Sequence, residues 1–273
     1  MEALRLTAEW PVARVAAAVV TPDGVAHTVG DIDASFRIAS IAKMLVGWTA
    51  LVACEEGTVA LDQPYGQEGC TLRHLLAHAG GYAFDGDAPI AKPGTRRTYS
   101  NTGIELATRC IAEAADMPFE QYQREAVLEP LGMATTTLRG SPAHAVRSSV
   151  RDLLRFVAEL RAPQLVSAAS ALAFRTVQFP ELAGIVPGVG RYDPCPWGLG
   201  TEIRGAKSPH WTGPHNSTST YGHFGGAGTL LWVDPGVEVA VVALTDRPFD
   251  EWSTEALQQW PRFADAVLAE VYA

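Results

Sequence analysis

Ser40 and Lys43 are the first residues of this sequence whose types and spacing suggest chemistry. They lie three residues apart in the apolar segment FRIASIAKMLVGW, residues 36–48, of a chain whose other lysines are Lys92 and Lys207. A serine hydroxyl becomes a strong nucleophile when a neighbouring base takes its proton. A lysine can be that base if burial and the positive end of a helix lower the pKa of its ammonium group. The pair therefore predicts a nucleophilic serine with an amine base.

A helix is expected to begin at Ser40, which would place the side chains of Ser40 and Lys43 on one face. The Ser40 backbone N–H would then be free to stabilise an oxyanion. The alternative is structural, with Ser40 as a helix cap and Lys43 extending its ammonium group to water. The S-x-x-K spacing does not decide between the two, because so short a pattern also occurs by chance.

Two further segments favour the chemical interpretation. TYSNTG, residues 98–103, carries a tyrosine and an asparagine two positions apart, and YGHFGGAG, residues 221–228, carries a histidine before a pair of glycines. With SIAK, these segments resemble the S-x-x-K, Y-x-N and K/H-T/S-G motifs of the serine β-lactamase and penicillin-binding protein superfamily. Their order and spacing are similar to those of the class C branch, which includes D-alanyl-D-alanine carboxypeptidases and serine esterases.

The resemblance covers roughly residues 35–244. LRHLLAHAGGY resembles the branch's LLTHTSGL, and the stretch around TYSNTG ends in PLGM, as it does in that branch. Later segments also match, namely SSVRDLLRFVAEL, WGLGTEI and the final hairpin GHFGGAGTLLWVDPGVEVAVVAL. The chain is therefore identified as a member of this superfamily, which implies a serine hydrolase.

The resemblance implies roles for four polar side chains. Ser40 would attack the carbonyl carbon of the substrate and become acylated, while Lys43 and Tyr99 would share its proton. The base would be either the neutral Lys43 amine or the Tyr99 phenolate, and both stay open. Asn101 would position the substrate amide and contact Lys43.

The third motif implies the remaining contacts. His223 would take the place of a cationic residue on the edge strand, and the Gly226 N–H would face the Ser40 N–H as the second oxyanion donor. Gly225 and Gly226 would let the backbone approach the acyl group, which a Cβ atom would hinder.

Structural alternatives exist for most of these residues. Tyr99 and His223 could be packing residues with satisfied polar atoms, and Asn101 could be a plain helix cap. Ser100 is expected to be a turn or cap residue in either case. His78 is expected to belong to the scaffold.

Phe224 departs from the family pattern, because it occupies the Thr/Ser position of the third motif. In β-lactam-directed members that hydroxyl helps to hold the carboxylate of the antibiotic. A phenyl ring cannot hydrogen-bond a carboxylate, and it narrows the pocket and makes it more apolar. This favours a small ester or amide as the substrate of a Ser40 acyl-enzyme. The alternatives are a β-lactamase or D,D-carboxypeptidase, and an acylatable penicillin-binding or sensor protein with little turnover.

These residues must be positioned by elements that the hydrophobic pattern predicts. Strands are expected at residues 14–21, from 25 onward, 197–204, 228–233 and 237–244. Helices are expected at residues 40–56, 71–78, 101–115, 118–127, 149–160 and 254–272. Residues 179–196 are rich in glycine and proline and are expected to form a loop.

Strands, then helices, then strands predict an α+β fold. We expect a mostly antiparallel sheet from both chain ends, flanked by helices, with an inserted helical lobe. Residues 1–273 would form a single domain with a sheet lobe at about 1–50 and 190–273 and a helical lobe at about 51–189. The site would lie in the cleft between the lobes.

Composition limits the partners. The chain has 273 residues, a net charge of −9 and no run of Lys or Arg, which argues against a nucleic-acid or membrane partner and leaves small molecules. There is no apolar stretch of membrane-spanning length and no signal-peptide pattern, so a cytoplasmic location is expected. The sequence does not indicate the oligomeric state.

The cysteines and histidines do not suggest a cofactor. Cys54, Cys70, Cys110 and Cys195 lack C-x-x-C spacing and are expected to be reduced and mostly buried. His74 and His78 lie four residues apart, but neither a third ligand nor the glutamate of H-E-x-x-H accompanies them. We therefore expect neither a metal site nor a cofactor.

Overall fold

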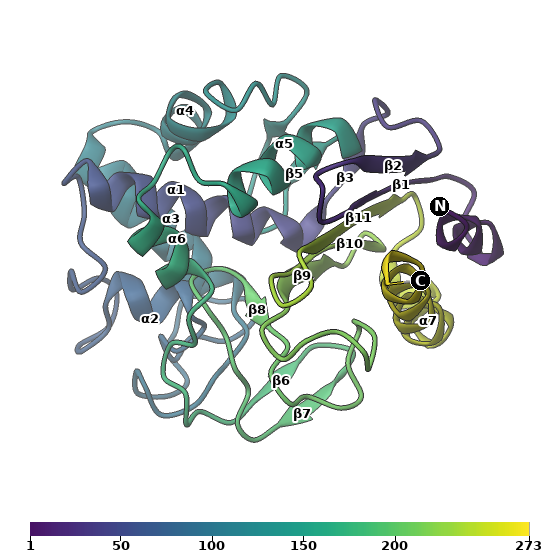
Figure 1. Cartoon of the computed structure of the whole chain (residues 1–273). Helices are drawn as coiled ribbons and strands as arrows, with labels where there is room; N and C mark the ends of the chain where they lie inside the picture. Colours follow the sequence, from purple (N-terminus) through teal and green to yellow (C-terminus); the bar gives the residue numbers. More distant parts are fainter. Residues whose placement is uncertain (273) are drawn as a thin grey trace.

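The computed structural model describes residues 1–272, and its centre is a six-stranded antiparallel sheet in the order β2-β1-β11-β10-β9-β8 (Figure 1). The strands are β1 (Val15–Val20), β2 (Ala26–Val29), β8 (Glu202–Ile203), β9 (Tyr221–Gly225), β10 (Thr229–Asp234) and β11 (Val239–Thr245). The first strand pairs with the last, with Val15 opposite Thr245. The predicted α+β fold, with a sheet built from both chain ends, is confirmed.

Both faces of the sheet are covered, which explains why its central strands are apolar at successive positions. Ala16 and Ala18 of β1 pack into the core under α1 and α5, whereas Ala17 and Val19 pack into a second core under α7. Successive side chains of a strand point to opposite faces, so a strand buried on both faces has no polar alternation. Figure 1 shows α7 on one side of the sheet and α1 and α5 on the other.

Residues 1–272 form seven α-helices around the sheet. They are α1 (Ala42–Glu55), α2 (Leu72–Leu76), α3 (Asn101–Ala115), α4 (Phe119–Gln123), α5 (Val150–Arg161), α6 (Ala168–Phe174) and α7 (Ser253–Val271). Side-chain oxygens of Thr71, Ser100, Ser149 and Ser167 cap α2, α3, α5 and α6 by accepting a backbone N–H. Twelve of the 14 residues of α1 are buried, because α1 lies between the sheet and the other helices.

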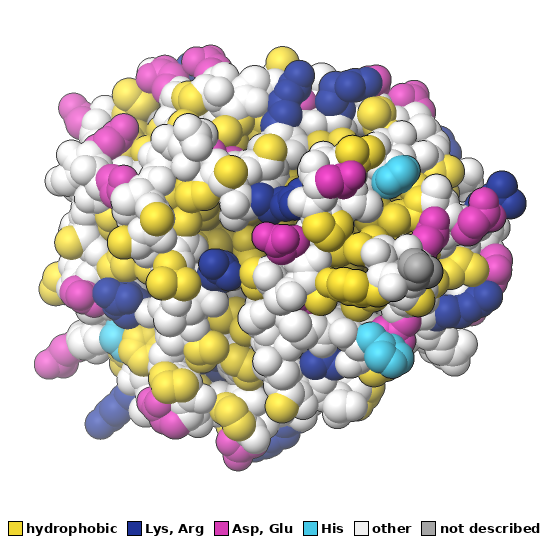
Figure 2. All heavy atoms as spheres, in the orientation of Figure 1, with side chains coloured by type: hydrophobic (Ala, Val, Ile, Leu, Met, Phe, Trp, Pro, Cys, Tyr) yellow, Lys and Arg dark blue, Asp and Glu magenta, His cyan; other side chains and the backbone are white. Residues whose placement is uncertain are grey.

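Short elements complete the chain. They are the 3-10 helices η1 (Ala3–Glu9), η2 (Ala39–Ile41) and η4 (Phe249–Glu251), the π-helix η3 (Arg124–Leu128), and the strands β3 (Phe36–Arg37), β4 (Thr137–Leu138), β5 (Val146–Ser148), β6 (Gly184–Val186) and β7 (Gly190–Tyr192). Residues 51–189, predicted as the helical lobe, thus hold α2–α6 but also β4, β5 and β6. Within residues 1–272, no helix is both long and apolar enough to cross a membrane. Acidic and basic side chains are scattered over the face shown in Figure 2.

The predictions were wrong in the region that follows α6. Residues 179–196, expected to be a loop, contain the β6–β7 hairpin, whose turn holds Gly188 at φ +75°. Three-residue strands among glycines are too short to show alternation. Of the strand expected at 197–204, only β8 pairs with β9, because the chain turns at Gly200, which has φ +79°.

The hydrophobic pattern missed one strand of the central sheet. Residues 221–225 precede β10, as expected, but they also form β9 themselves, which agrees with the resemblance in placing His223 on a strand. Glycine at positions 222 and 225 hid the strand pattern. Gly222 has a packing reason, since a Cβ atom there would lie 2.1 Å from the Leu231 carbonyl oxygen. Helix α6 and η1 were not predicted.

Candidate active site

Ser40 lies in the 3-10 turn η2, which leads directly into α1, and not at the first residue of the α-helix as predicted. The preceding Ala39 has φ +44°, which is strained for a residue with a Cβ atom. Neither η2 nor α1 is capped by a side chain. The Ser40 hydroxyl is therefore not a helix cap, which removes the structural alternative for this residue.

The C-terminal half of the chain holds this turn in place. Thr229 Oγ1 donates a hydrogen bond of 3.1 Å to the Ile38 carbonyl oxygen. A Cβ atom on Gly225 would lie 2.4 Å from the same oxygen, whereas one on Gly226 would meet nothing within 4 Å. Gly226 lines the cavity in front of Ser40, and the expectation that a Cβ atom there would hinder the acyl group stays a prediction. Gly225 is required because β9 packs directly against the turn that carries Ser40.

Lys43 is fully buried, and its amine contacts three oxygens that carry no formal charge. Nζ lies 3.1 Å from Ser40 Oγ, 2.8 Å from Asn101 Oδ1 and 2.9 Å from the Ala143 carbonyl oxygen. Within residues 1–272, Lys43 forms no ion pair. The alternative in which this amine reaches water is therefore wrong.

Burial lowers the pKa of Lys43 to about 7, although the charges of Asp85 and Glu105 oppose this shift. Much of the amine is then neutral at neutral pH, with two N–H donors and one lone pair. The Asn101 and Ala143 oxygens can only accept hydrogen bonds, so they take the two N–H groups. The lone pair is left for the Ser40 O–H.

Asn101 is the first residue of α3 and is not its cap. Ser100 accepts the Gly103 N–H at 2.8 Å, so the expectation for Ser100 is confirmed and the cap alternative for Asn101 is wrong. Asn101 Nδ2 donates to Asp85 Oδ1 at 3.1 Å. This contact orients the amide so that its oxygen faces Lys43.

Tyr99 packs beside Lys43 among aromatic rings. Its ring centroid lies 4.8 Å from Lys43 Nζ, 4.6 Å from the His78 ring and 5.8 Å from the Phe84 ring. Burial raises the pKa of the Tyr99 hydroxyl, while the neighbouring Ser40 hydroxyl opposes the rise. The resting side chain is therefore a neutral phenol rather than a phenolate.

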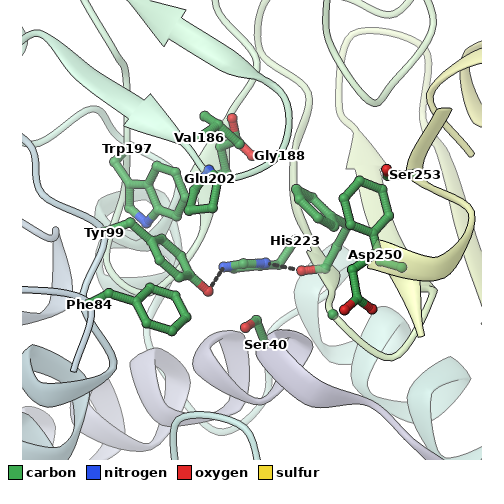
Figure 3. A pocket seen from close by; sticks show the side chains of 14 residues that line it. Ser40, Phe84, Tyr99, Val186, Gly188, Trp197, Glu202, His223, Asp250 and Ser253 are labelled. Atoms are coloured by element: carbon green, nitrogen blue, oxygen red, sulfur yellow. Dashed lines mark hydrogen bonds between the residues drawn. The ribbon is translucent and has the colours of Figure 1, made fainter.

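His223 is neutral, which differs from the expectation of a cationic position. Its Nδ1 donates to the Phe224 carbonyl at 2.5 Å, and this tautomer leaves Nε2 to accept the Tyr99 O–H at 3.4 Å (Figure 3). Burial and the charge of Lys43 lower the pKa of His223 to about 3. Strand β8 pairs only with residues 221–222 of β9, so the part of β9 that carries His223 lies at the edge of the sheet, as the resemblance implied.

His78 supports the segment that carries Tyr99. Its side chain is 1% exposed, its backbone has φ +55°, and its Nδ1 accepts the Ser100 N–H at 3.2 Å. The His78 carbonyl also accepts the Thr98 N–H at 2.8 Å. These contacts fit the expected scaffold role.

A cavity of about 350 Å³ opens in front of Ser40 (Figure 3). Tyr99, His223, Phe224 and Gly226 line it with Ser40, so the structure brings together these predicted residues, while Lys43 and Asn101 lie behind the serine. The lining residues that the sequence did not single out are Phe84, Val186, Pro187, Gly188, Trp197, Glu202, Phe249, Asp250 and Ser253. Of these, only Trp197 and Glu202 belong to a quoted family segment, WGLGTEI.

Glu202 places a buried carboxylate at the wall of this cavity. It contacts Lys207 Nζ at 3.0 Å, His210 Nε2 at 3.1 Å and Trp211 Nε1 at 2.7 Å. Burial by itself would raise the pKa of Glu202, but Lys207 and His210 bring it well below its usual value. These three partners lie in a short stretch after β8, in which no motif or apolar periodicity had pointed to a functional residue.

No metal centre is found in the part of the chain that the structure describes, since no group of three or more His, Cys, Asp or Glu side chains there could hold an ion. His74 contacts Thr71 Oγ1 at 2.8 Å and stacks on Phe179. The four cysteines are free thiols, buried except for the half-buried Cys54.

A six-stranded antiparallel sheet with a serine, a buried lysine and a tyrosine at one cavity defines a protein of the serine β-lactamase and penicillin-binding protein superfamily. A model of the family described as Beta-lactamase matches residues 12–262, and the chain belongs to this family. The recognition made from the three motifs is confirmed.

Similar proteins agree with this placement. The chain is 49% identical to a β-lactamase (Mb2281c) from Mycobacterium bovis, with a TM-score of 0.95 over 98% of this chain and 99% of that one. It is 27% identical to the D-alanyl-D-alanine-carboxypeptidase/endopeptidase AmpH of Escherichia coli, over 44% of this chain and only 41% of that protein. EstCE1, a hydrolase with promiscuous acyltransferase activity, shares the fold at 17% identity, with a TM-score of 0.76 over 96% of each chain.

Proposed function

We propose that this protein is a serine hydrolase that forms an acyl-enzyme on Ser40 and acts on a small ester or amide. The environment of Lys43 carries this proposal. A fully buried amine with two obligate acceptors and one serine hydroxyl within 3.1 Å is arranged as a base for that serine. A lysine kept only for stability would instead be expected to meet a carboxylate.

The lowered pKa of Lys43 and the raised pKa of Tyr99 favour one assignment of the proton transfers. The neutral Lys43 amine takes the Ser40 proton as Oγ attacks the carbonyl carbon. Tyr99 then gives its proton to the leaving oxygen or nitrogen and regains one from the Lys43 ammonium group. Water attacks the acyl-enzyme with the same groups in reverse order, which restores Ser40. The Ser40 and Gly226 N–H groups would stabilise the oxyanion.

The cavity favours a substrate that is neutral near the scissile bond. Its charged lining residues, among those described, are the acids Glu202 and Asp250, while His223 is neutral. Phe224 packs against Phe249 with ring centroids 5.0 Å apart and offers no hydrogen bond. Lys207 compensates the charge of Glu202, so a carboxylate next to the scissile amide, as in a penicillin, would meet Asp250 and apolar rings, with no cation among the described lining residues. This favours an ester or amide over a β-lactam.

A β-lactamase or D,D-carboxypeptidase is the second candidate. The 49% identity to the Mycobacterium bovis β-lactamase favours it, and AmpH, a D-alanyl-D-alanine-carboxypeptidase/endopeptidase, matches part of the chain. Membership of the class C branch and a cytoplasmic location stay predictions from the sequence. The third candidate, a penicillin-binding or sensor protein, differs in that its acyl group would persist.

Mass spectrometry of the intact protein distinguishes the three candidate functions in one experiment. Wild-type protein, Ser40→Ala and the surface control Ser170→Ala are exposed in parallel to a fluorophosphonate, a penicillin and p-nitrophenyl butyrate. We expect one adduct on wild type and on Ser170→Ala, none on Ser40→Ala, and a butyryl adduct that decays at the rate of turnover. Labelling or full hydrolysis by Ser40→Ala would contradict the proposal. Rapid loss of the penicilloyl group would favour a β-lactamase, and a persistent one a sensor.

A further inference from the structure

A second hollow of about 430 Å³ adjoins the cavity in front of Ser40. We call it the outer pocket. It shares Phe84, Tyr99 and Pro187 with that cavity, so the two lie side by side along these residues. The other walls of the outer pocket come from residues 83–98 and from the β6–β7 hairpin, residues 183–191.

The outer pocket gathers exposed apolar side chains. Phe84, Ile90 and Ile185 are 50%, 51% and 56% exposed, and all three line it. They are half of the large hydrophobic side chains that the described residues leave exposed. Exposed apolar residues that gather at one place indicate a binding surface. The Phe84 ring also stacks beside Tyr99, so an apolar group lying on it would be close to the Tyr99 hydroxyl (Figure 3).

Two arginines without an acidic partner lie in the same pocket. Arg96 and Arg191 line it, and neither forms an ion pair within residues 1–272. The one side-chain contact of Arg96 there is a long hydrogen bond, 3.5 Å, to the Ile90 carbonyl. Some exposed arginines elsewhere meet carboxylates, as Arg151 and Arg262 do, whereas others, such as Arg139, form no ion pair among the described residues, so the feature of this pocket is that its arginines lie beside an apolar wall. In a chain of net charge −9, arginines without carboxylates beside an apolar wall are suited to bind an anion.

Arg97 also lines the pocket but is used by the fold. Its guanidinium group is 3% exposed and donates to the carbonyl oxygens of Cys195 at 2.6 Å and Phe179 at 2.9 Å. The anion would therefore meet Arg96 and Arg191.

Tyr99 fixes which part of the substrate faces this pocket. In acyl transfer, the group that protonates the leaving atom must face it. Tyr99 lies between Ser40 and the outer pocket, because it lines both hollows while Ser40 lines only the inner one. The leaving group is thus directed outward, and the acyl group lies in the cavity with Phe224 and Phe249.

We propose that the outer pocket binds the leaving group of the substrate, an alcohol or amine with an apolar chain that ends in an anion. This inference rests on the proposed function. Hydrolysis consumes one water molecule and releases the acyl group as a carboxylic acid. The leaving group is released as an anion that carries a free hydroxyl or amino group. Asp250 lines the inner cavity, where Lys207 compensates the charge of Glu202, and Arg96 and Arg191 line the outer pocket, so such a substrate has one favourable orientation.

Three esters test the proposal by kinetics. They are the butyrate ester of 6-hydroxyhexanoate, hexyl butyrate, and the monobutyl ester of adipate, which carries its charge on the acyl side. We expect kcat/KM for the first to exceed that for hexyl butyrate by about fivefold at low salt, the size of a partly exposed charge contact. Arg96→Ala and Arg191→Ala should each reduce this ratio, whereas the control Arg5→Ala, at an exposed arginine far from the pocket, should keep it.

Calorimetry with Ser40→Ala protein measures binding of the same esters without turnover. Tighter binding of the 6-hydroxyhexanoate ester than of hexyl butyrate, lost in Ser40→Ala/Arg191→Ala, is expected. Equal binding, or a preference that survives both arginine variants, overturns the proposal, as does a stronger preference for the adipate ester. If wild-type protein hydrolyses no ester, the proposed function fails, while the binding data still decide the occupant of the pocket.

Discussion

Lys43 and Lys207 have the same side chain and nearly the same burial, at 0% and 3% exposed, but their amines meet different partners. Lys43 Nζ contacts a serine hydroxyl, an amide oxygen and a backbone carbonyl. Lys207 Nζ contacts the Glu202 carboxylate at 3.0 Å and the carbonyl oxygens of Pro196 and Ile203. The decisive difference is one negative charge.

A buried ammonium group is unfavourable unless a counter-charge compensates for the loss of hydration. Lys207 has that compensation, and the ion pair in turn lets Glu202 remain ionised at the wall of the cavity. Lys43 lacks it, so burial lowers its pKa to about 7. Burial without a counter-charge therefore lowers the pKa of Lys43, as the proposed base requires, whereas the neighbouring carboxylate compensates the buried amine of Lys207.

The largest effect is expected from Lys43→Met. Loss of the general base should lower kcat/KM for p-nitrophenyl butyrate by about 10²–10⁴-fold. Thermal unfolding should show a change in the free energy of unfolding of no more than a few kcal/mol, because the loss of a buried amine is offset by the Asn101 and Ala143 oxygens that lose their donor. Lys43→Arg, which keeps a positive charge but cannot act as a base, should be as inactive. Near wild-type rates in either variant would show that Lys43 is not the base.

Lys207→Met should act on stability. It leaves the buried Glu202 carboxylate without its lysine, which should reduce the free energy of unfolding by about 3–5 kcal/mol. Urea unfolding followed by tryptophan fluorescence measures the change. The double variant Lys207→Met/Glu202→Gln should recover part of the loss, because it removes the unpaired charge. If the free energy of unfolding falls by less than about 1 kcal/mol, the charge of Glu202 does not depend on Lys207 for compensation.

The smallest effect should be a shift of the pH–rate profile. Only neutral Lys43 can take the Ser40 proton, so kcat/KM should rise as the pH increases through about 7 and then level off. Asp85 raises the pKa of Lys43, so Asp85→Asn should move this midpoint to lower pH. Lys207→Arg, which keeps the charge beside Glu202, is the matched control. If the midpoint does not move in Asp85→Asn, the pH–rate profile does not report the pKa of Lys43.

The sequence predicted those features that depend on local chemistry. Periodic apolar residues located the long helices, and the three motifs selected Ser40, Lys43, Tyr99 and Asn101. Contacts between distant segments were not readable. The neutrality of His223 follows from burial beside Lys43, and the need for glycine at position 225 follows from its contact with the turn before α1.

The walls of the two pockets were the least predictable part. Phe84 and the β6–β7 hairpin lie in segments rich in glycine, proline and polar residues. In such segments neither the helical nor the strand spacing of apolar residues continues long enough to be detected. Their importance depends on which side chains the folded loops expose, and sequence spacing does not encode that.

The bond from Thr229 to the Ile38 carbonyl joins residues 191 positions apart, and β1 pairs with β11, the last strand of the sheet in sequence, as well as with its neighbour β2. During synthesis, the segment that carries Ser40 leaves the ribosome long before Thr229 and β11 do. While the chain is being made, the turn before α1 thus lacks the strands that hold it. The nascent polypeptide should remain inert toward reactive esters until about residue 245 has emerged, and fragments lacking β9–β11 should resist acylation.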